Sequence, residues 1–179
     1  MVPYYMAKKS KRNAVKNTNL ILMVIGVVMA VLAWVGLACN FINVKRTLLG
    51  ISDTQQLNLS HWFDTINDFQ DYSEVAGWQI ARSLLIVTTV VLVVMTVLMV
   101  AKVLMKHSLL KWLTLGVSVA AIACAAIFMI TTFIGCGALT GNIDVMATGI
   151  EYSVNVGVFL FGIGAMISAI CATIVAVRK

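Results

Sequence analysis

The chain alternates long apolar runs with shorter polar segments. Each apolar run exceeds the ~18 residues that a helix needs to cross the hydrocarbon core of a bilayer, and its interior carries no charge. A helix satisfies its own backbone hydrogen bonds in lipid, whereas a few open strands could not. We therefore predict an all-α integral membrane protein, a bundle of four transmembrane helices. The predicted helices cover about residues 19–40, 83–105, 109–134 and 154–177.

The composition supports lipid as the solvent. Of the 179 residues, 61% are hydrophobic and only 11% are charged, whereas soluble domains are about half apolar and a quarter charged. The net charge of +6 could indicate nucleic acid, but the basic residues flank the apolar runs, as membrane topology requires. We therefore expect no nucleic-acid partner, and we divide the chain into a basic tail at 1–18 and a membrane domain at 19–179.

The charged residues divide unequally between the two ends of the predicted bundle. The tail, the turn between the second and third helices and the C-terminal end hold ten Lys and Arg and no acid. The opposite end holds three, Lys45, Arg46 and Arg82, together with all seven acids. Because Lys and Arg accumulate in short cytoplasmic segments, we expect both termini in the cytoplasm and outer loops at about 41–81 and 135–153. The expected location is the cytoplasmic or plasma membrane.

The two outer loops differ in length. The first has about 40 residues, which is too long for a simple connector. It begins with short β-compatible stretches at 41–59, around a turn candidate at 50–53. The second is shorter and Gly-rich, and it predicts a turn-laden cap over the third and fourth helices.

A short amphipathic helix is predicted at 61–74, within the first outer loop. Apolar residues recur there at i, i+4 and i+7 on one face, and acidic residues follow the same spacing on another. The apolar face holds Trp62, Ile66 and Phe69, and the acidic face holds Asp64, Asp68 and Asp71. Ser60 is the candidate N-cap.

Three interpretations of this helix stay open. Its aromatic face could pack on the outer ends of the bundle as a lid, with the carboxylates merely solvated. It could instead dock a partner, because exposed aromatics beside charge resemble interface anchors. Cation binding by the carboxylates is the third interpretation, although the spacing of an EF-hand loop is missing. The candidate partner-binding residues are Trp62, Phe63, Asp64, Ile66, Asp68, Phe69, Asp71 and Glu74.

Small residues recur at helical spacing in three of the predicted transmembrane helices. Such residues let helix backbones approach closely in lipid. They serve either the packing of the bundle itself or an interface between copies of the chain. They are Gly26 and Ala30, Gly116 and Ala120, and Gly157, Gly164, Ser168 and Ala172.

Two of the four cysteines, Cys39 and Cys136, fall at the outer ends of their predicted helices. Their similar depth allows a disulfide on the oxidising face, and the alternative is two unpaired buried thiols. No C-x-x-C motif is present. His61 and His107 are expected on opposite sides of the membrane, so we predict no metal site.

The layout of the chain resembles that of claudin-like tetraspans. The segment QIARSLLI at 79–86 is similar to the one in which claudins carry an Arg at the start of their second helix, and WVGL at 34–37 is similar to their W-G-L-W motif. Claudins also carry a cysteine pair in the first outer loop, and residues 40–82 contain no cysteine. The resemblance is one of layout over the whole chain, and it does not extend to tight-junction function.

The sequence favours an interaction role over chemistry. No nucleophile–base set, metal cluster or phosphate loop is recognisable, so neither enzyme activity nor a cofactor is expected. The predicted helix interiors lack carboxylates, His and Arg, which disfavours a proton-coupled transporter. We expect an accessory or scaffold subunit in the lipid bilayer whose outer loop contacts another membrane protein or a second copy. The alternative is an oligomeric channel or passive transporter.

Overall fold

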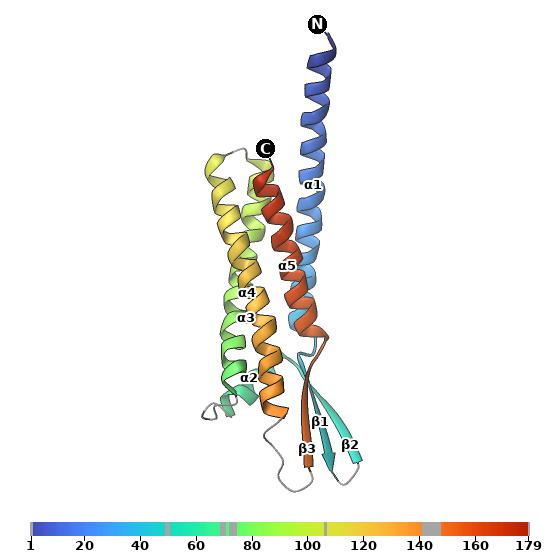
Figure 1. Ribbon diagram of the computed structural model, residues 1–179, viewed down its shortest axis with the longest axis vertical. Helices are drawn as coiled ribbons and strands as arrows, with labels where there is room; N and C mark the ends of the chain where they lie inside the picture. Colours follow the sequence, from blue (N-terminus) through green and yellow to red (C-terminus); the bar gives the residue numbers. More distant parts are fainter. Residues whose placement is uncertain are drawn as a thin grey trace.

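Four long helices form a bundle, and a small β-sheet lies at one end of it (Figure 1). The computed structural model describes residues 2–48, 51–68, 71, 75–105, 107–140 and 148–178. The long helices are α1 (Val2–Ala38), α3 (Ala76–Leu104), α4 (Ser108–Thr140) and α5 (Val156–Val177). Within the described residues, these four are long and apolar enough to cross a membrane.

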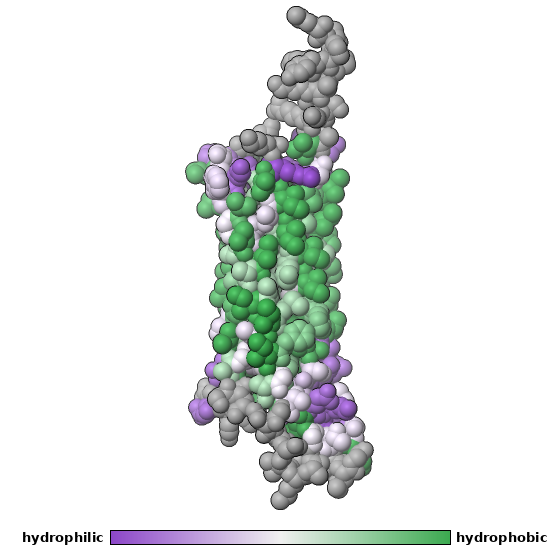
Figure 2. All heavy atoms as spheres, viewed as in Figure 1, coloured by the Kyte–Doolittle hydropathy of each residue, from purple (hydrophilic) through white to green (hydrophobic). Residues whose placement is uncertain are grey.

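An apolar belt surrounds the middle of the bundle. Figure 2 shows this belt between two more polar ends. Large side chains such as Val97 and Ile130 are more than half exposed on it, which would be costly in water and costs nothing in lipid. The four apolar helices therefore suggest a multi-pass membrane protein. The start of α1 and the end of α5 lie at the same end of the bundle, opposite the sheet (Figure 1).

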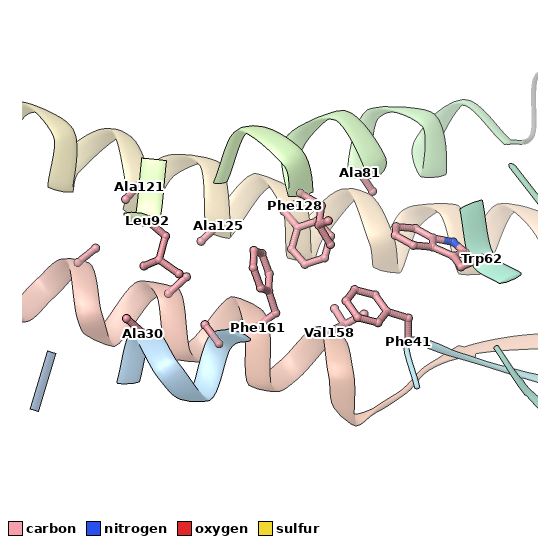
Figure 3. Close-up of a cluster of buried hydrophobic side chains, with 14 of the residues drawn as sticks. Ala30, Phe41, Trp62, Ala81, Leu92, Ala121, Ala125, Phe128, Val158 and Phe161 are labelled. Atoms are coloured by element: carbon pink, nitrogen blue, oxygen red, sulfur yellow. The ribbon is translucent and has the colours of Figure 1, made fainter. Parts of the chain in front are cut away.

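The helix α5 packs against both α1 and α4, and α4 packs against α3. The interior between them combines alanines with a few large rings and chains (Figure 3). Phe128 of α4 and Phe161 of α5 meet edge to face, with ring centroids 5.4 Å apart. Ala121 and Ala125 are fully buried on α4 beside them.

The backbones of α1 and α5 approach very closely. A Cβ atom added to Gly36 would lie 2.6 Å from the backbone nitrogen of Phe161, and one added to Gly164 would lie 2.9 Å from the carbonyl oxygen of Met29. No side chain larger than hydrogen fits at these two crossing points. The structure places six of the small residues from the sequence analysis inside the bundle: Gly26, Ala30, Gly157, Gly164, Ser168 and Ala172.

The small residues of α4 behave differently. Gly116 and Ala120 lie on an exposed face, and a Cβ atom at Gly116 would meet nothing within 4 Å. The close approach of α4 to α3 occurs instead at Gly135, where a Cβ atom on Gly77 would lie 3.0 Å from the Cα atom of Gly135. Both glycines lie in segments for which the sequence predicts outer loops.

The prediction of an all-α protein was wrong, because a three-stranded antiparallel sheet is present. It consists of β1 (Ile42–Leu48), β2 (Ile51–Leu57) and β3 (Thr148–Val154), in the order β2-β1-β3. The second outer loop is therefore not only a set of turns. Its first residues continue α4 to Thr140, and its last residues form β3. The β-compatible stretches of the first loop pair with each other as β1 and β2, and β3 provides the second partner of β1.

The amphipathic helix predicted at 61–74 corresponds to α2 (Leu59–Asp68), and residues 69–70 and 72–74 lie outside the described residues. Its N-cap residue is Asn58, whose Oδ1 atom accepts a hydrogen bond from the His61 backbone N–H at 3.0 Å. Ser60, the predicted cap, lies inside the first turn. The turn candidate at 50–53 was also misplaced, because Ile51–Asp53 belong to β2.

Candidate functional site

We call the sheet and α2 together the cap. Backbone hydrogen bonds fasten it to the bundle where the chain leaves α1 and enters α5. The Gly157 N–H donates to the Asn40 carbonyl oxygen (2.9 Å), and the Asn155 N–H donates to that of Phe41 (2.8 Å). The Asn155 side-chain amide also donates to the Asn43 Oδ1 atom at 2.7 Å. The cap is therefore tied directly to the two most closely packed helices.

A chain of aromatic contacts fills the space between the cap and the bundle. Trp62 of α2 stacks on Phe41, with ring centroids 5.6 Å apart, and meets Trp78 of α3 edge-on at 6.1 Å. Trp78 in turn contacts Tyr152 of β3 edge-on at 5.3 Å. Trp62 and Trp78 are 0% and 1% exposed. Four separate segments of the chain therefore converge on one apolar cluster (Figure 3 labels Phe41 and Trp62).

The predicted partner-binding residues divide into a buried and an exposed set. Trp62 and Ile66 are buried and cannot touch a partner, so the apolar face of α2 is a lid. Phe63 is partly covered by Arg82, whose guanidinium carbon lies 4.8 Å from the ring centroid. The exposed members of the set are Asp64, Asp68 and Asp71. Phe69 and Glu74 lie outside the described residues.

The structure does not support metal binding at these carboxylates. Within the described ranges, no group of three or more His, Cys, Asp and Glu side chains could hold a metal ion.

The structure contains Cys39 and Cys136 as free thiols, so the predicted disulfide is not formed in it. Cys39 follows α1, whereas Cys136 lies within α4. These two helices share little direct interface, because α5 packs against both of them. A similar depth in the bilayer did not imply that the two sulfur atoms are neighbours.

The strand β2 forms an open edge of the sheet, and its residues from Ile51 to Gln56 are all exposed. The Asn155 N–H donates to the Phe41 carbonyl oxygen, so Phe41 and Asn155 form a hydrogen-bonded pair between β1 and β3. Ile42 and Val154 are the next pair along this ladder. Because successive residues of a strand direct their backbone groups to opposite sides, those of Ile42 point toward β2. Ile42 pairs with Leu57, so the backbone groups of Leu57 point toward β1. The same alternation along β2 directs the backbone N–H and C=O groups of every second residue away from the sheet. The residues with outward backbone N–H and C=O groups are Ser52, Thr54 and Gln56.

No protein-family model and no curated protein matches this chain. Function is therefore inferred from the geometry and the charges of the cap.

The polar contacts of the sheet are modest. Lys45 and Glu151 form an ion pair at 3.8 Å between two strands, but both side chains are about half exposed, so the pair adds little stability. Tyr152 is less accessible. Burial raises its pKa above the ordinary value, and the nearby Arg46 offsets part of that increase. The hydroxyl of Tyr152 is therefore neutral at physiological pH.

Proposed function

We propose that the protein is an interaction or accessory subunit of the cell membrane, and that the edge of β2 is its recognition surface. The exposed edge strand is the observation that carries this proposal. A strand with free N–H and C=O groups can accept an extended segment of another chain by main-chain hydrogen bonding. Edge strands often carry Pro or Lys, which prevent pairing with another chain. The strand β2 contains neither residue.

The charges favour another protein over a second copy as the partner. All seven acids of the chain belong to the face predicted to be outside, against three basic residues. Two such surfaces repel each other, whereas a partner with basic residues beside its extended segment is attracted. We therefore propose a membrane protein with a basic outer segment as the partner.

The test uses two substitutions at one outward-facing position. Thr54→Pro removes a backbone N–H that the sheet itself does not use, which an edge strand tolerates. Thr54→Val changes the side chain but retains the N–H. After extraction in gentle detergent, we expect a stoichiometric partner to be retained by the wild type and by Thr54→Val and to be lost with Thr54→Pro. Fluorescence of the buried tryptophans checks that the cap is still folded.

Two outcomes of this test would count against the proposal. Equal retention by Thr54→Pro means that β2 is not the recognition surface. Loss of the partner with both variants means that the Thr54 side chain, and not the strand edge, is recognised.

An oligomeric channel is the second candidate function, and the exposed Gly116 and Ala120 of α4 favour it. Small residues on an exposed helix face could contact another copy. The interior of a single bundle is filled by side chains such as Leu92, Phe128 and Phe161, so a pore would have to run between copies. Ion or solute flux through the purified protein in vesicles would favour this function over the accessory role.

A further inference from the structure

A polar pocket of about 380 Å³ lies where α2 packs beside the beginning of α3. In the described part of the chain it is lined by Ile66, Asn67, Asp71, Gln79, Arg82 and Ser83. Ligand pockets in proteins range from about 300 to 1,000 Å³, so this volume suits a compact polar group. None of the lining residues belongs to the β2 edge, which makes the pocket independent of the proposed recognition surface.

The pocket lies at the level of one membrane interface. Arg82 is the last charged residue before the apolar part of α3, and the next one is Lys102. Lys102 follows Arg82 by 20 positions, which span roughly 30 Å at about 1.5 Å per residue, the thickness of the hydrocarbon core. When Lys102 lies at one surface of the bilayer, Arg82 therefore lies at the depth of the phosphate groups of the opposite leaflet.

Arg82 is held in place by two neighbours, and among the described residues only one of its guanidinium nitrogens donates a hydrogen bond. Its guanidinium lies over the Phe63 ring, and its Nη1 atom donates to the Asn67 Oδ1 atom. A guanidinium has five N–H donors, and two of them can bind a phosphate side by side. Among the residues that the structure describes, no carboxylate lies within ion-pair distance of Arg82.

Asp71 supplies the opposite charge to the same pocket. Its carboxylate is exposed and lines the pocket without pairing to Arg82. An anion alone would be attracted by Arg82 and repelled by Asp71. A zwitterion with a phosphate and a cationic group would satisfy both, since each of its charges meets its opposite.

We propose that this pocket binds the headgroup of a zwitterionic phospholipid that carries a primary ammonium, as in phosphatidylethanolamine. The phosphate accepts hydrogen bonds from Arg82, and the ammonium donates to Asp71. A quaternary choline group has no N–H to donate, and a glycerol headgroup leaves Asp71 facing a net anion. The site therefore selects its lipid by the ammonium as well as by the phosphate.

Native mass spectrometry of the full chain, stripped of lipid in detergent, tests this selectivity. Phosphatidylethanolamine, phosphatidylcholine and phosphatidylglycerol with identical acyl chains are titrated in parallel. We expect the ethanolamine lipid to bind about tenfold more tightly than the other two, the size of effect that one charge-assisted hydrogen bond provides. Equal affinities for the three lipids would overturn the proposal.

Charge-neutralising variants locate the site. Arg82→Gln keeps an amide near Asn67 but loses the charge, and we expect it to weaken binding of the ethanolamine lipid about tenfold or more. Asp71→Asn should weaken the ethanolamine lipid and leave the glycerol lipid unchanged or tighter. The matched controls Arg46→Gln and Asp53→Asn change charges on the sheet, outside the pocket, and should have no effect. Lipid binding that is insensitive to both pocket variants would contradict the assignment.

Soluble competitors distinguish a lipid site from a general anion site. Glycerophosphoethanolamine is expected to displace the bound lipid, whereas inorganic phosphate at the same concentration is not. Displacement by phosphate alone would show a simple anion site and would overturn the proposal. If Arg82→Gln disturbs the cap, as judged by tryptophan fluorescence, the exposed Asp71→Asn variant decides the question. The β2 variant Thr54→Pro should bind the ethanolamine lipid normally.

Discussion

Small residues form the contacts between α1 and α5 of the bundle, whereas large aromatic residues form the contacts of the cap. Between α1 and α5 the smallest residues meet, and the backbone at Gly36 lies against that at Phe161. Where the cap meets the bundle the largest residues come together, and Phe41, Trp62 and Trp78 form one ring cluster. Small residues therefore form the contacts near the C-terminal end of α1, and large aromatic residues form those that begin at Phe41, shortly after this helix.

The difference follows from the two solvents. Lipid tails are as apolar as the helices, so burying a large side chain gains little there, and close backbone approach provides the attraction. The cap faces water, where each buried aromatic ring removes a large apolar area from solvent. Substitutions that change side-chain size should therefore have opposite consequences in the two regions.

Loss of the central cap ring should have the largest effect. Trp62→Ala removes a fully buried side chain and is expected to lower the free energy of unfolding of the cap by about 3–5 kcal/mol. The four bundle helices should persist, because their contacts with one another do not involve Trp62. Near-ultraviolet circular dichroism reports the cap and far-ultraviolet dichroism reports the helices during a denaturant titration.

Trp62→Phe is the matched control for that prediction. The Trp62 Nε1 atom makes no hydrogen bond within the described structure, so the smaller ring loses packing only and should cost clearly less than Ala. Simultaneous loss of helical signal and cap signal in Trp62→Ala would show that the bundle and the cap unfold as one unit and are not stabilised independently.

A larger side chain should be harmful in the bundle where two backbones meet and harmless where a glycine faces open space. Gly36→Leu forces a side chain against the backbone of α5 and is expected to cost about 1–3 kcal/mol or more. Gly116→Leu adds the same group where no atom lies within 4 Å, and we expect it to be nearly neutral. Unfolding of both variants in a mixed-detergent titration measures the difference.

The Gly116 variant also separates the two functional proposals. Destabilisation by Gly116→Leu, together with a smaller native mass, would show that this face contacts another copy and would favour the oligomeric channel. A neutral result at both glycines would mean that close packing does not hold α1 against α5.

The apolar runs predicted the helices well because spanning a bilayer is a local requirement of length and composition. Each of the four predicted segments coincides with one of these helices, apart from at most two residues at one end. The end of α4 was missed because Gly135 and Gly137 indicated a loop by their type. In the structure, Gly135 is needed for the packing of Trp78, which is a contact with another helix. No local pattern in α4 shows that neighbour.

The cap was less predictable because its contacts join distant segments. The spacing of Trp62 and Ile66 correctly placed them on one face of a helix, but their burial depends on Phe41 and Trp78, which approach from elsewhere. The strand β3 did carry a signal, since Ile150, Tyr152 and Val154 alternate with more polar residues. The glycines before that stretch indicate turns instead of a strand.

The ionisation of Tyr152 should have the smallest effect on the stability of the cap, because this effect is confined to alkaline pH. Burial raises the pKa of this phenol above the ordinary value of about 10. Below that pH the phenol is neutral in the folded and the unfolded cap, and stability is unaffected. As the pH rises further, the unfolded chain loses the proton while the folded cap keeps it, so the cap becomes less stable through the interval between the two pKa values.

Tyr152→Phe isolates this contribution. The variant lacks the titrating group, so its cap should lose less stability than the wild type between pH 10 and the raised pKa, as followed by near-ultraviolet dichroism. Ultraviolet absorbance of tyrosinate should show that the residue titrating last in the wild type is missing from the variant. Identical pH dependence in the two proteins would place Tyr152 in water and would break the aromatic chain that joins β3 to the bundle. In that case the ring contacts between the cap and the bundle would be limited to Phe41, Trp62 and Trp78, beside the backbone hydrogen bonds of Asn155 and Gly157.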